Sequence, residues 1–369
     1  MTRQAREYDH SAGQLIGPLT KILEKEALTE GPNLYKRDGW YYLMLAEGGT
    51  GWNHGISMAR SRSILGPYEL DPQTSVLTTR DDVSVPLQKA GHGEVVETSA
   101  GEWYLAHLAG RALPPNRRCM LGRETCLQKV VWSDDGWLRL ANGGWHPETK
   151  LPPPKGLPDH PWPAKPMRDH FDATELDLEW STLRVPANDS WLSLTERKGW
   201  LTLRGRDSLH SLIEQSLVAR HLEHFHCVIE TCLEFEPTHF TQMAGLVCYY
   251  DTRQHYYLRV THDEVRGKVL GVVQTDDGNY DELGNIPIGD WPRVFLRAEI
   301  DHSSLKFFAS KDGKVWQPIG PTLDASKLSD DYGQGLRFTG TMIGLCAQDL
   351  GGYRTAARFD YFEIRQLRQ

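Results

Sequence analysis

Hydrophobic and polar residues alternate in several short segments of the C-terminal half of the chain. Residues 200–204, 256–262 and 294–300 each place apolar side chains on one face with a period of two, which is typical of half-buried strands. Residues 306–310 and 315–316 flank a predicted hairpin loop at 311–314. Because many short strands separated by turns are typical of two stacked sheets, this half predicts a β-sandwich.

The N-terminal half contains a hairpin pattern. Residues 29–50 predict a strand, a tight turn at Asp38-Gly39 and a second strand, because this turn requires positive φ angles that glycine adopts freely. A turn followed by tryptophan recurs at Trp40, Trp103 and Trp137, at irregular intervals. Recurrent hairpins of this kind indicate propeller blades, and at about 40–50 residues per blade this half corresponds to roughly three of them.

A proline-rich passage separates the two halves. Eight prolines lie between residues 145 and 168, and such a run favours extended linker geometry over the interior of a sheet. The sequence therefore predicts an all-β protein with a partial propeller at 1–150, a linker at 151–168 and a β-sandwich at 169–369.

Composition narrows the class of protein. The 369 residues are 39% hydrophobic, with no apolar run of the roughly 18 residues that a membrane span needs, and the first seven residues lack the apolar region of a signal peptide. A net charge of −8 with interspersed signs argues against nucleic acid as a partner. Six cysteines without a C-x-x-C pair predict free thiols and neither a disulfide framework nor a zinc site. We therefore expect a cytoplasmic protein that binds neither membranes nor nucleic acids.

One carboxylate of the hairpin is a candidate for acid–base chemistry. Glu30 precedes Gly31-Pro32, and the proline restricts the backbone beside it. Hydrolysis of a glycosidic bond needs such an acid, with its pKa raised by burial or by a second carboxylate. The alternative is that Glu30 caps a strand end or forms a salt bridge.

The amino-acid sequence of several segments resembles glycoside hydrolase family 43, in its β-xylosidase branch. The resemblance runs through most of the chain, in segments 29–36, 90–93, 102–108, 121–125, 329–332 and 338–340. It implies a five-bladed β-propeller followed by a concanavalin-like β-sandwich. It also implies an exo-acting, inverting β-xylosidase that releases xylose from xylo-oligosaccharides, with possible α-L-arabinofuranosidase activity.

The resemblance assigns roles to five residues. It implies that Glu30 is the general acid and that Thr50, His92, Arg123 and Phe338 bind the sugar. Each has a plain structural alternative: a turn threonine, a satisfied histidine, an Arg123 salt bridge to its neighbour Glu124, and a core phenylalanine. Two further positions are weighed, Glu47 as a structural carboxylate rather than the base, and Trp52 as a possible wall of the pocket.

The resemblance also concerns the catalytic base, the partners and the cofactors of this chain. In the family, the catalytic base and a second aspartate lie in N-terminal blades, which we expect to be absent from this chain. We therefore expect a homo-oligomer or a complementing N-terminal polypeptide. No cofactor is expected to be required, although a divalent cation such as calcium could lie near His92. The alternatives are a catalytically inactive carbohydrate-binding protein and a truncated fragment of the enzyme.

Overall fold

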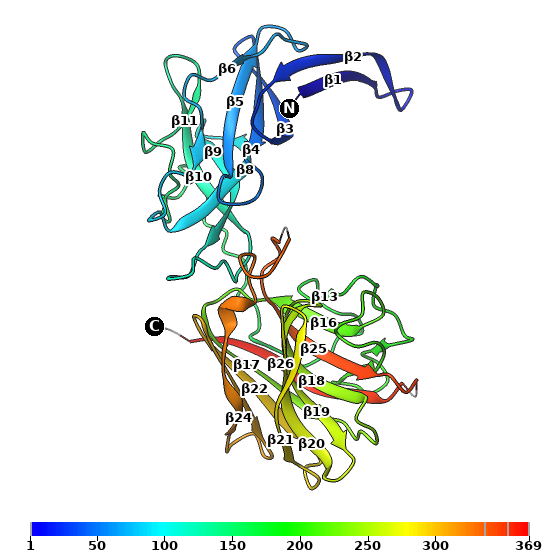
Figure 1. The fold of residues 1–369 in the computed structure, drawn as a ribbon. Coiled ribbons are helices and arrows are strands. Elements are labelled where there is room, and N and C mark those ends of the chain that lie inside the picture. Colours follow the sequence, from blue (N-terminus) through cyan, green and yellow to red (C-terminus); the bar gives the residue numbers. More distant parts are fainter. Residues whose placement is uncertain (1, 336, 353, 368–369) are drawn as a thin grey trace. The chain divides into compact units, whose positions relative to one another are not determined.

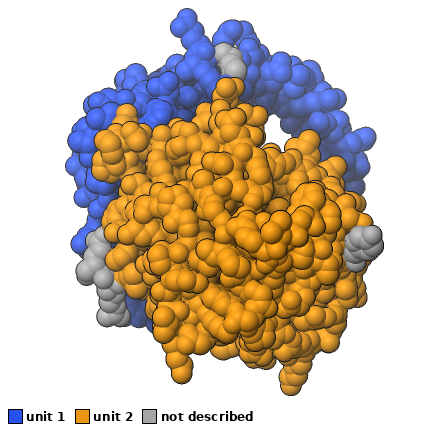
Figure 2. All heavy atoms as spheres, turned by 60° about the horizontal axis from the view of Figure 1, so that its bottom comes forward, with its two compact units in different colours: residues 1–112, 123–161 blue, residues 113–122, 162–369 orange. Residues whose placement is uncertain are grey.

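The computed structural model describes residues 2–335, 337–352 and 354–367, and its regular elements are almost all strands (Figure 1). The chain divides into two compact units, which Figure 2 colours separately. Unit 1 comprises residues 1–112 and 123–161, and unit 2 comprises residues 113–122 and 162–369. Over the described ranges the single helix is the 3-10 turn η1 (Ala325–Lys327). The prediction of an all-β chain is confirmed.

The first sheet of unit 1 contains the predicted hairpin. Its strands are β3 (Thr29–Arg37), β4 (Trp40–Glu47), β5 (Gly55–Ser61) and β6 (Glu69–Leu70), hydrogen-bonded in this order, with β7 (Leu77–Thr78) also paired to β5. Asp38 and Gly39 connect β3 to β4 with φ angles of 49° and 75°. Positive φ at both central residues matches the twist of the strands, so the predicted tight turn is confirmed.

The second sheet of unit 1 has the order β11-β10-β9-β8. These strands are β8 (Leu87–Glu97), β9 (Trp103–Arg111), β10 (Glu124–Trp132) and β11 (Leu138–Leu140). A buried cluster joins the two sheets, with Met44 and Met58 from the first and Leu105 and Val130 from the second. This shared core fixes both sheets as one unit.

A two-stranded ribbon precedes these sheets. It is formed by β1 (Thr2–Asp9) and β2 (Gln14–Glu24), which pair only with each other in the described part of the chain, and it extends away from the sheets in Figure 1. Leu23 at its end packs with Leu43 and Leu45 of β4. The turns before Trp103 and Trp137 belong to the same sheet, and the estimate of roughly three blades stays a prediction. The five-blade arrangement stays a prediction.

Unit 2 consists of two stacked sheets. One has the order β14-β15-β26-β17-β22-β23-β24, with β12 added beside β26; the other has the order β13-β16-β25-β18-β19-β20-β21. The strands of the first are β12 (Arg168–Asp169), β14 (Leu192–Ser193), β15 (Leu201–Arg204), β17 (His226–Glu234), β22 (Val294–Asp301), β23 (Ser304–Ser310), β24 (Gln317–Asp324) and β26 (Ala356–Gln366). Those of the second are β13 (Ser181–Thr182), β16 (Ser216–His221), β18 (Gln242–Asp251), β19 (Gln254–Asp263), β20 (Gly267–Asp276), β21 (Asn279–Pro287) and β25 (Met342–Asp349).

A single large core lies between the sheets of unit 2, as alternation predicts. In β19, for example, Leu258 and Val260 face this core, whereas Tyr257 faces a smaller cluster on the outer side. The strands predicted at 200–204, 256–262, 294–300 and 306–310 are confirmed by β15, β19, β22 and β23. The β-sandwich prediction is therefore confirmed.

A ten-residue loop of the N-terminal half belongs to unit 2. Residues 113–122 connect β9 to β10, and Met120 and Leu121 are buried in the sandwich core. The backbone N–H of Cys119 donates to Asp331 Oδ2 at 2.9 Å, and Arg118 Nη1 lies 3.1 Å from Asp324 Oδ2. Because this loop belongs to unit 2, neither unit is one continuous segment of the chain. The predicted domain limits stay a prediction.

Candidate active site

Glu30 lies at an irregularity of the first sheet. It pairs with Ala46 of β4, and the register shifts between Glu30 and Asn33, where Gly31 has a φ of 51°. Such a bulge bends the strand and changes the direction of its side chains. The Glu30 side chain is exposed, so unit 1 does not supply the burial that was expected for an acid.

His92 lies directly against this bulge. A Cβ atom on Gly31 would be only 2.6 Å from His92 Nε2, so the imidazole occupies the space that a side chain would fill. His92 has a φ of 48°, and β8 shifts register on both sides of Gly91. The absence of a side chain at Gly31 therefore lets His92 lie beside the residue next to Glu30.

His54 is a site residue that the sequence did not reveal. It is 2% exposed, and its ring packs on Gly91, where a Cβ would lie 2.5 Å away. Its Nδ1 is 2.9 Å from the Lys89 carbonyl oxygen, which can only accept, so Nδ1 carries the proton. It is one of 15 histidines, and no spacing in the sequence distinguishes it from the others.

The surroundings of His54 link the candidate residues electrostatically. Burial lowers the pKa of His54 below 6.5, and electrostatic interactions with Arg123 and His92 lower it further. The bond to the Lys89 carbonyl and the negative charge of Glu30 oppose this change in pKa. His54 is therefore neutral at pH 7 and lies within electrostatic reach of three predicted site residues.

Arg123 and Thr50 are brought together. The Arg123 guanidinium donates from Nη2 to the backbone carbonyl of Thr50, so the turn after β4 is attached to the start of β10. The alternative partner, Glu124, is held instead by Arg111, whose Nε and Nη2 lie 2.8 and 2.7 Å from its two oxygens. This bidentate pair engages both oxygens of Glu124, and the alternative of a salt bridge for Arg123 stays open.

Glu47 is engaged in ion pairs. Lys25 Nζ contacts one of its oxygens, and Arg80 Nη1 lies 3.2 Å from the other. Burial raises the pKa of Glu47, but the bonds from Lys25 and Arg80 outweigh burial, and the pKa lies below 4.5. A carboxylate that two cations hold ionised fits the structural role expected for it.

Trp52 lies beside a buried lysine. Lys89 is 3% exposed and has a φ of 55°, and its ammonium is 4.7 Å from the centre of the Trp52 ring. This cation–π contact fixes the tryptophan next to the strand that carries His92. Lys89, like His54, was not predicted.

Phe338 belongs to unit 2, where its side chain is 49% exposed. The alternative of a core phenylalanine is therefore wrong. Its neighbour Arg337 forms an ion pair with Asp251 at 3.1 Å within the same unit. Its role at the sugar site stays a prediction, as do the roles of Glu30, Thr50, His92 and Arg123.

The divalent cation expected near His92 stays a prediction. Across the described residues, no three side chains of histidine, cysteine, aspartate or glutamate come together as metal ligands. His92 could supply one nitrogen, whereas calcium prefers six to eight oxygen ligands. No step of the chemistry is therefore derived through a metal.

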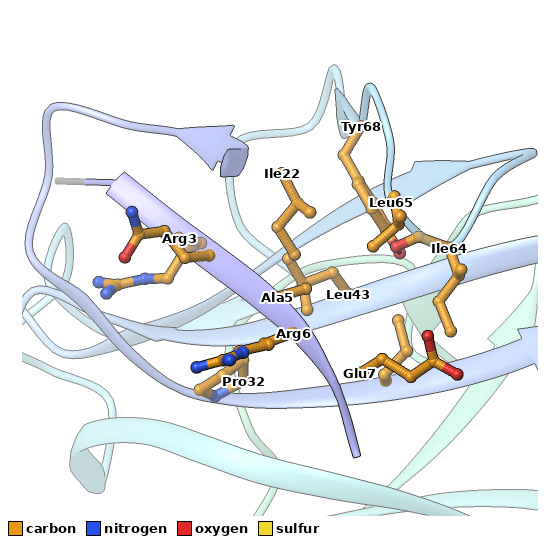
Figure 3. Close-up of a pocket in the computed structure, with 12 residues that line it drawn as sticks. Arg3, Ala5, Arg6, Glu7, Ile22, Pro32, Leu43, Ile64, Leu65 and Tyr68 are labelled. Carbon is orange, nitrogen blue, oxygen red and sulfur yellow. Dashed lines mark hydrogen bonds between the residues drawn. The ribbon is translucent and has the colours of Figure 1, made fainter. Parts of the chain in front are cut away.

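A hollow of about 590 Å³ lies beside the ribbon of unit 1 (Figure 3). Ile22, Ile64, Leu65 and Tyr68 gather there next to β1, and most of the lining is apolar. Pro32, two residues after Glu30, also lines it. An apolar hollow of this size marks a binding or contact surface.

All six cysteines have free thiols, and five of them are buried. Burial raises the pKa of Cys126 to about 11 and that of Cys227 to about 12, so these thiols are not reactive nucleophiles. The described residues form no helix with the length and apolar character of a membrane span.

Comparisons with known proteins agree with this architecture. The sequence profile of glycosyl hydrolases family 43 matches residues 4–138, and that of the β-xylosidase C-terminal concanavalin A-like domain matches residues 168–365. A xylan 1,3-β-xylosidase of a Vibrio species is 42% identical over 97% of this chain and 69% of its own length. The xylosidase/arabinosidase 43B of Humicola insolens is 39% identical over 98% of this chain and 69% of its own length.

A solved structure is also similar. The xylan β-1,4-xylosidase of Bacillus halodurans C-125 is 49% identical and superposes with a TM-score of 0.95, covering 98% of this chain and 70% of that one. The concanavalin-like nature of unit 2 is thus confirmed. The expected absence of N-terminal blades stays a prediction.

Proposed function

The chain belongs to glycosyl hydrolases family 43, and we propose on this basis that it is an exo-acting, inverting β-xylosidase. Its substrates would be xylo-oligosaccharides, from which it releases xylose. The relative that carries both xylosidase and arabinosidase in its name supports additional activity on α-L-arabinofuranosides.

Glu30 would act as the general acid of a single displacement. It would protonate the oxygen of the leaving sugar while a second carboxylate takes a proton from water attacking the opposite face of the ring. In inverting enzymes these carboxylates are about 6.5–9.5 Å apart, which leaves space for that water. Glu47 is not a candidate for the second carboxylate, because Lys25 and Arg80 already hold it.

The observation that carries the proposal is the contact between the Glu30 bulge and His92. The imidazole fills the space above Gly31, and His54 places Arg123 and Glu30 within one electrostatic neighbourhood. A carboxylate, an imidazole and a guanidinium near one strand end offer the donors and acceptors that sugar hydroxyls need.

We also propose that a second carboxylate reaches the site from another copy in a homo-oligomer or from a complementing N-terminal polypeptide. The apolar hollow beside the ribbon supports a contact surface in unit 1 (Figure 3). Size-exclusion chromatography with light scattering would test the oligomer. A monomeric mass together with full activity would exclude both sources. The cytoplasmic location stays a prediction.

The test is hydrolysis of an aryl β-D-xyloside by the full chain, with an aryl α-L-arabinofuranoside measured in parallel. Glu30→Gln should lower turnover by about 10²–10⁴-fold, the usual contribution of acid–base catalysis. Glu26→Gln is the matched control, since Glu26 is also an exposed glutamate just before β3. Equal activity of the two variants would refute the role of Glu30.

A second function is favoured by the exposure of Glu30. An exposed carboxylate can hydrogen-bond sugar hydroxyls, so the chain could bind sugars without hydrolysing them. Sugar binding by a folded wild-type chain that shows no turnover would support this alternative, a catalytically inactive carbohydrate-binding protein or a truncated enzyme.

A further inference from the structure

A second cavity, of about 580 Å³, lies on the outer face of the sandwich in unit 2. It covers β18 to β21, which lie side by side in Figure 1, together with β25 and the loop at Ser208–His210. In β19, Tyr257 and His255 face this side of the sheet, opposite the residues of the main core. The volume is within the range of sites for small ligands.

Aromatic rings form much of the cavity. The His210 ring lies 5.2 Å from that of His255 and 5.9 Å from that of Tyr280, measured between centres. Tyr280 is 49% exposed and Phe240 is 54% exposed, so two large ring surfaces at this cavity remain open to solvent. Large exposed rings at a concave surface indicate a binding site rather than core packing.

The cavity carries no uncompensated charge at pH 7. Glu282 is its single lining carboxylate; Arg259 Nη2 lies 2.7 Å from one of its oxygens, and the Tyr280 hydroxyl donates to the other at 2.8 Å. Burial lowers the pKa of both His210 and His255, the latter to about 4, so both imidazoles are neutral. A phosphate would find no unpaired cation among the lining residues, and a metal ion would find no free carboxylate.

We propose that this cavity binds a pyranose unit of a xylan chain, as a sugar site in a different unit from Glu30. The C–H face of a sugar ring packs on exposed aromatic rings such as Tyr280 and Phe240. The hydroxyls of Ser208 and Tyr280 and the His210 imidazole line the same cavity and can exchange hydrogen bonds with sugar hydroxyls. The choice of xylan as the glycan rests on the proposed function.

Affinity electrophoresis of the full chain in gels containing soluble arabinoxylan tests this site. All variants are made in a Glu30→Gln background, which prevents turnover and leaves the sugar contacts of unit 2 intact. Tyr280→Ala and Phe240→Ala should each weaken retention roughly tenfold, the effect of losing about 1.4 kcal/mol of binding. Trp162→Ala is the matched control, because it removes an 89% exposed ring of unit 2 outside the cavity.

The outcomes separate this site from the proposed active site. Retention that is lost in both cavity variants and kept in Trp162→Ala supports the sugar site. Absence of retention in the Glu30→Gln chain, or retention unchanged by Tyr280→Ala and Phe240→Ala in variants with native circular dichroism, overturns it. Hydrolysis of the aryl xyloside in the wild-type background is measured separately, so a failure of the proposed function is distinguished from a failure of this site.

Discussion

Replacing Glu47 by glutamine removes the carboxylate that Lys25 and Arg80 share. The Glu47 side chain is 8% exposed, and those of Lys25 and Arg80 are 18% and 31% exposed. Breaking a fully buried ion pair costs about 3–5 kcal/mol, whereas an exposed pair contributes about 0–1 kcal/mol. Because both cations keep part of their hydration, we expect Glu47→Gln to lower the free energy of unfolding by about 2–3 kcal/mol.

The matched control is Glu69→Gln. Glu69 is also a strand glutamate paired with an arginine, Arg60, at 2.6 Å, but it is 55% exposed. This variant should lose at most about 1 kcal/mol. Differential scanning calorimetry measures both, and at about 2–4 °C per kcal/mol the Glu47 variant should melt roughly 4–12 °C below the wild type.

The pH dependence gives a second test of the same reasoning. The folded pKa of Glu47 lies below 4.5, so its contribution to stability is fully present above that pH and is lost as the pH falls through the folded pKa. The gap in melting temperature between wild type and Glu47→Gln should therefore close on acidification. Equal destabilisation by the two glutamine variants, or a gap that persists in acid, would refute the ion-pair account.

Three further predictions concern the site and the thiols. Gly31→Ala should destabilise the protein more than Gly13→Ala in urea unfolding, because both have positive φ but the new methyl collides with His92 only at Gly31; equal losses would exclude the collision. Since the folded pKa of His54 is below 6.5, its contribution to stability is present above pH 6.5 and is lost as the pH falls toward the folded pKa. His54→Gln should therefore reduce the slope of the free energy of unfolding against pH in this range, and an unchanged slope would contradict this account of His54. A thiol reagent should find no fast-reacting cysteine in the native protein and six after unfolding, given the buried thiols.

The regular strands were predictable because local signals determine them. The Asp38-Gly39 turn and the alternation at 200–204 each depend on a few adjacent residues, and the structure contains both. The assignment of hairpins to sheets was not predictable, because a hairpin signal does not tell whether the next hairpin starts a new sheet. In sheet β11-β10-β9-β8 two such hairpins share one sheet.

The sequence assigned roles only to those site residues that lie in segments resembling the family. Glu30, His92 and Arg123 came from the resemblance, and the structure places them near one another through Gly31 and His54. His54 itself was missed because its role depends on the two bulges of β8, and a bulge has no sequence signal apart from a glycine. Burial and contacts between sheets depend on residues far apart in the chain, so a local sequence pattern does not reveal them.

The loop at residues 113–122 also affects how the protein is made. Its buried Met120 and Leu121 leave the ribosome long before their partners, since Asp331, which holds Cys119, is synthesised some 200 residues later. At a synthesis rate of about 5–20 residues per second, roughly 10–40 s pass between the synthesis of these side chains and that of the core in which they are buried. The chain also passes between the units three times, so a cut at residue 162 would not release a complete unit 2. Expression of the sandwich as a separate domain therefore requires this early loop to be supplied as well.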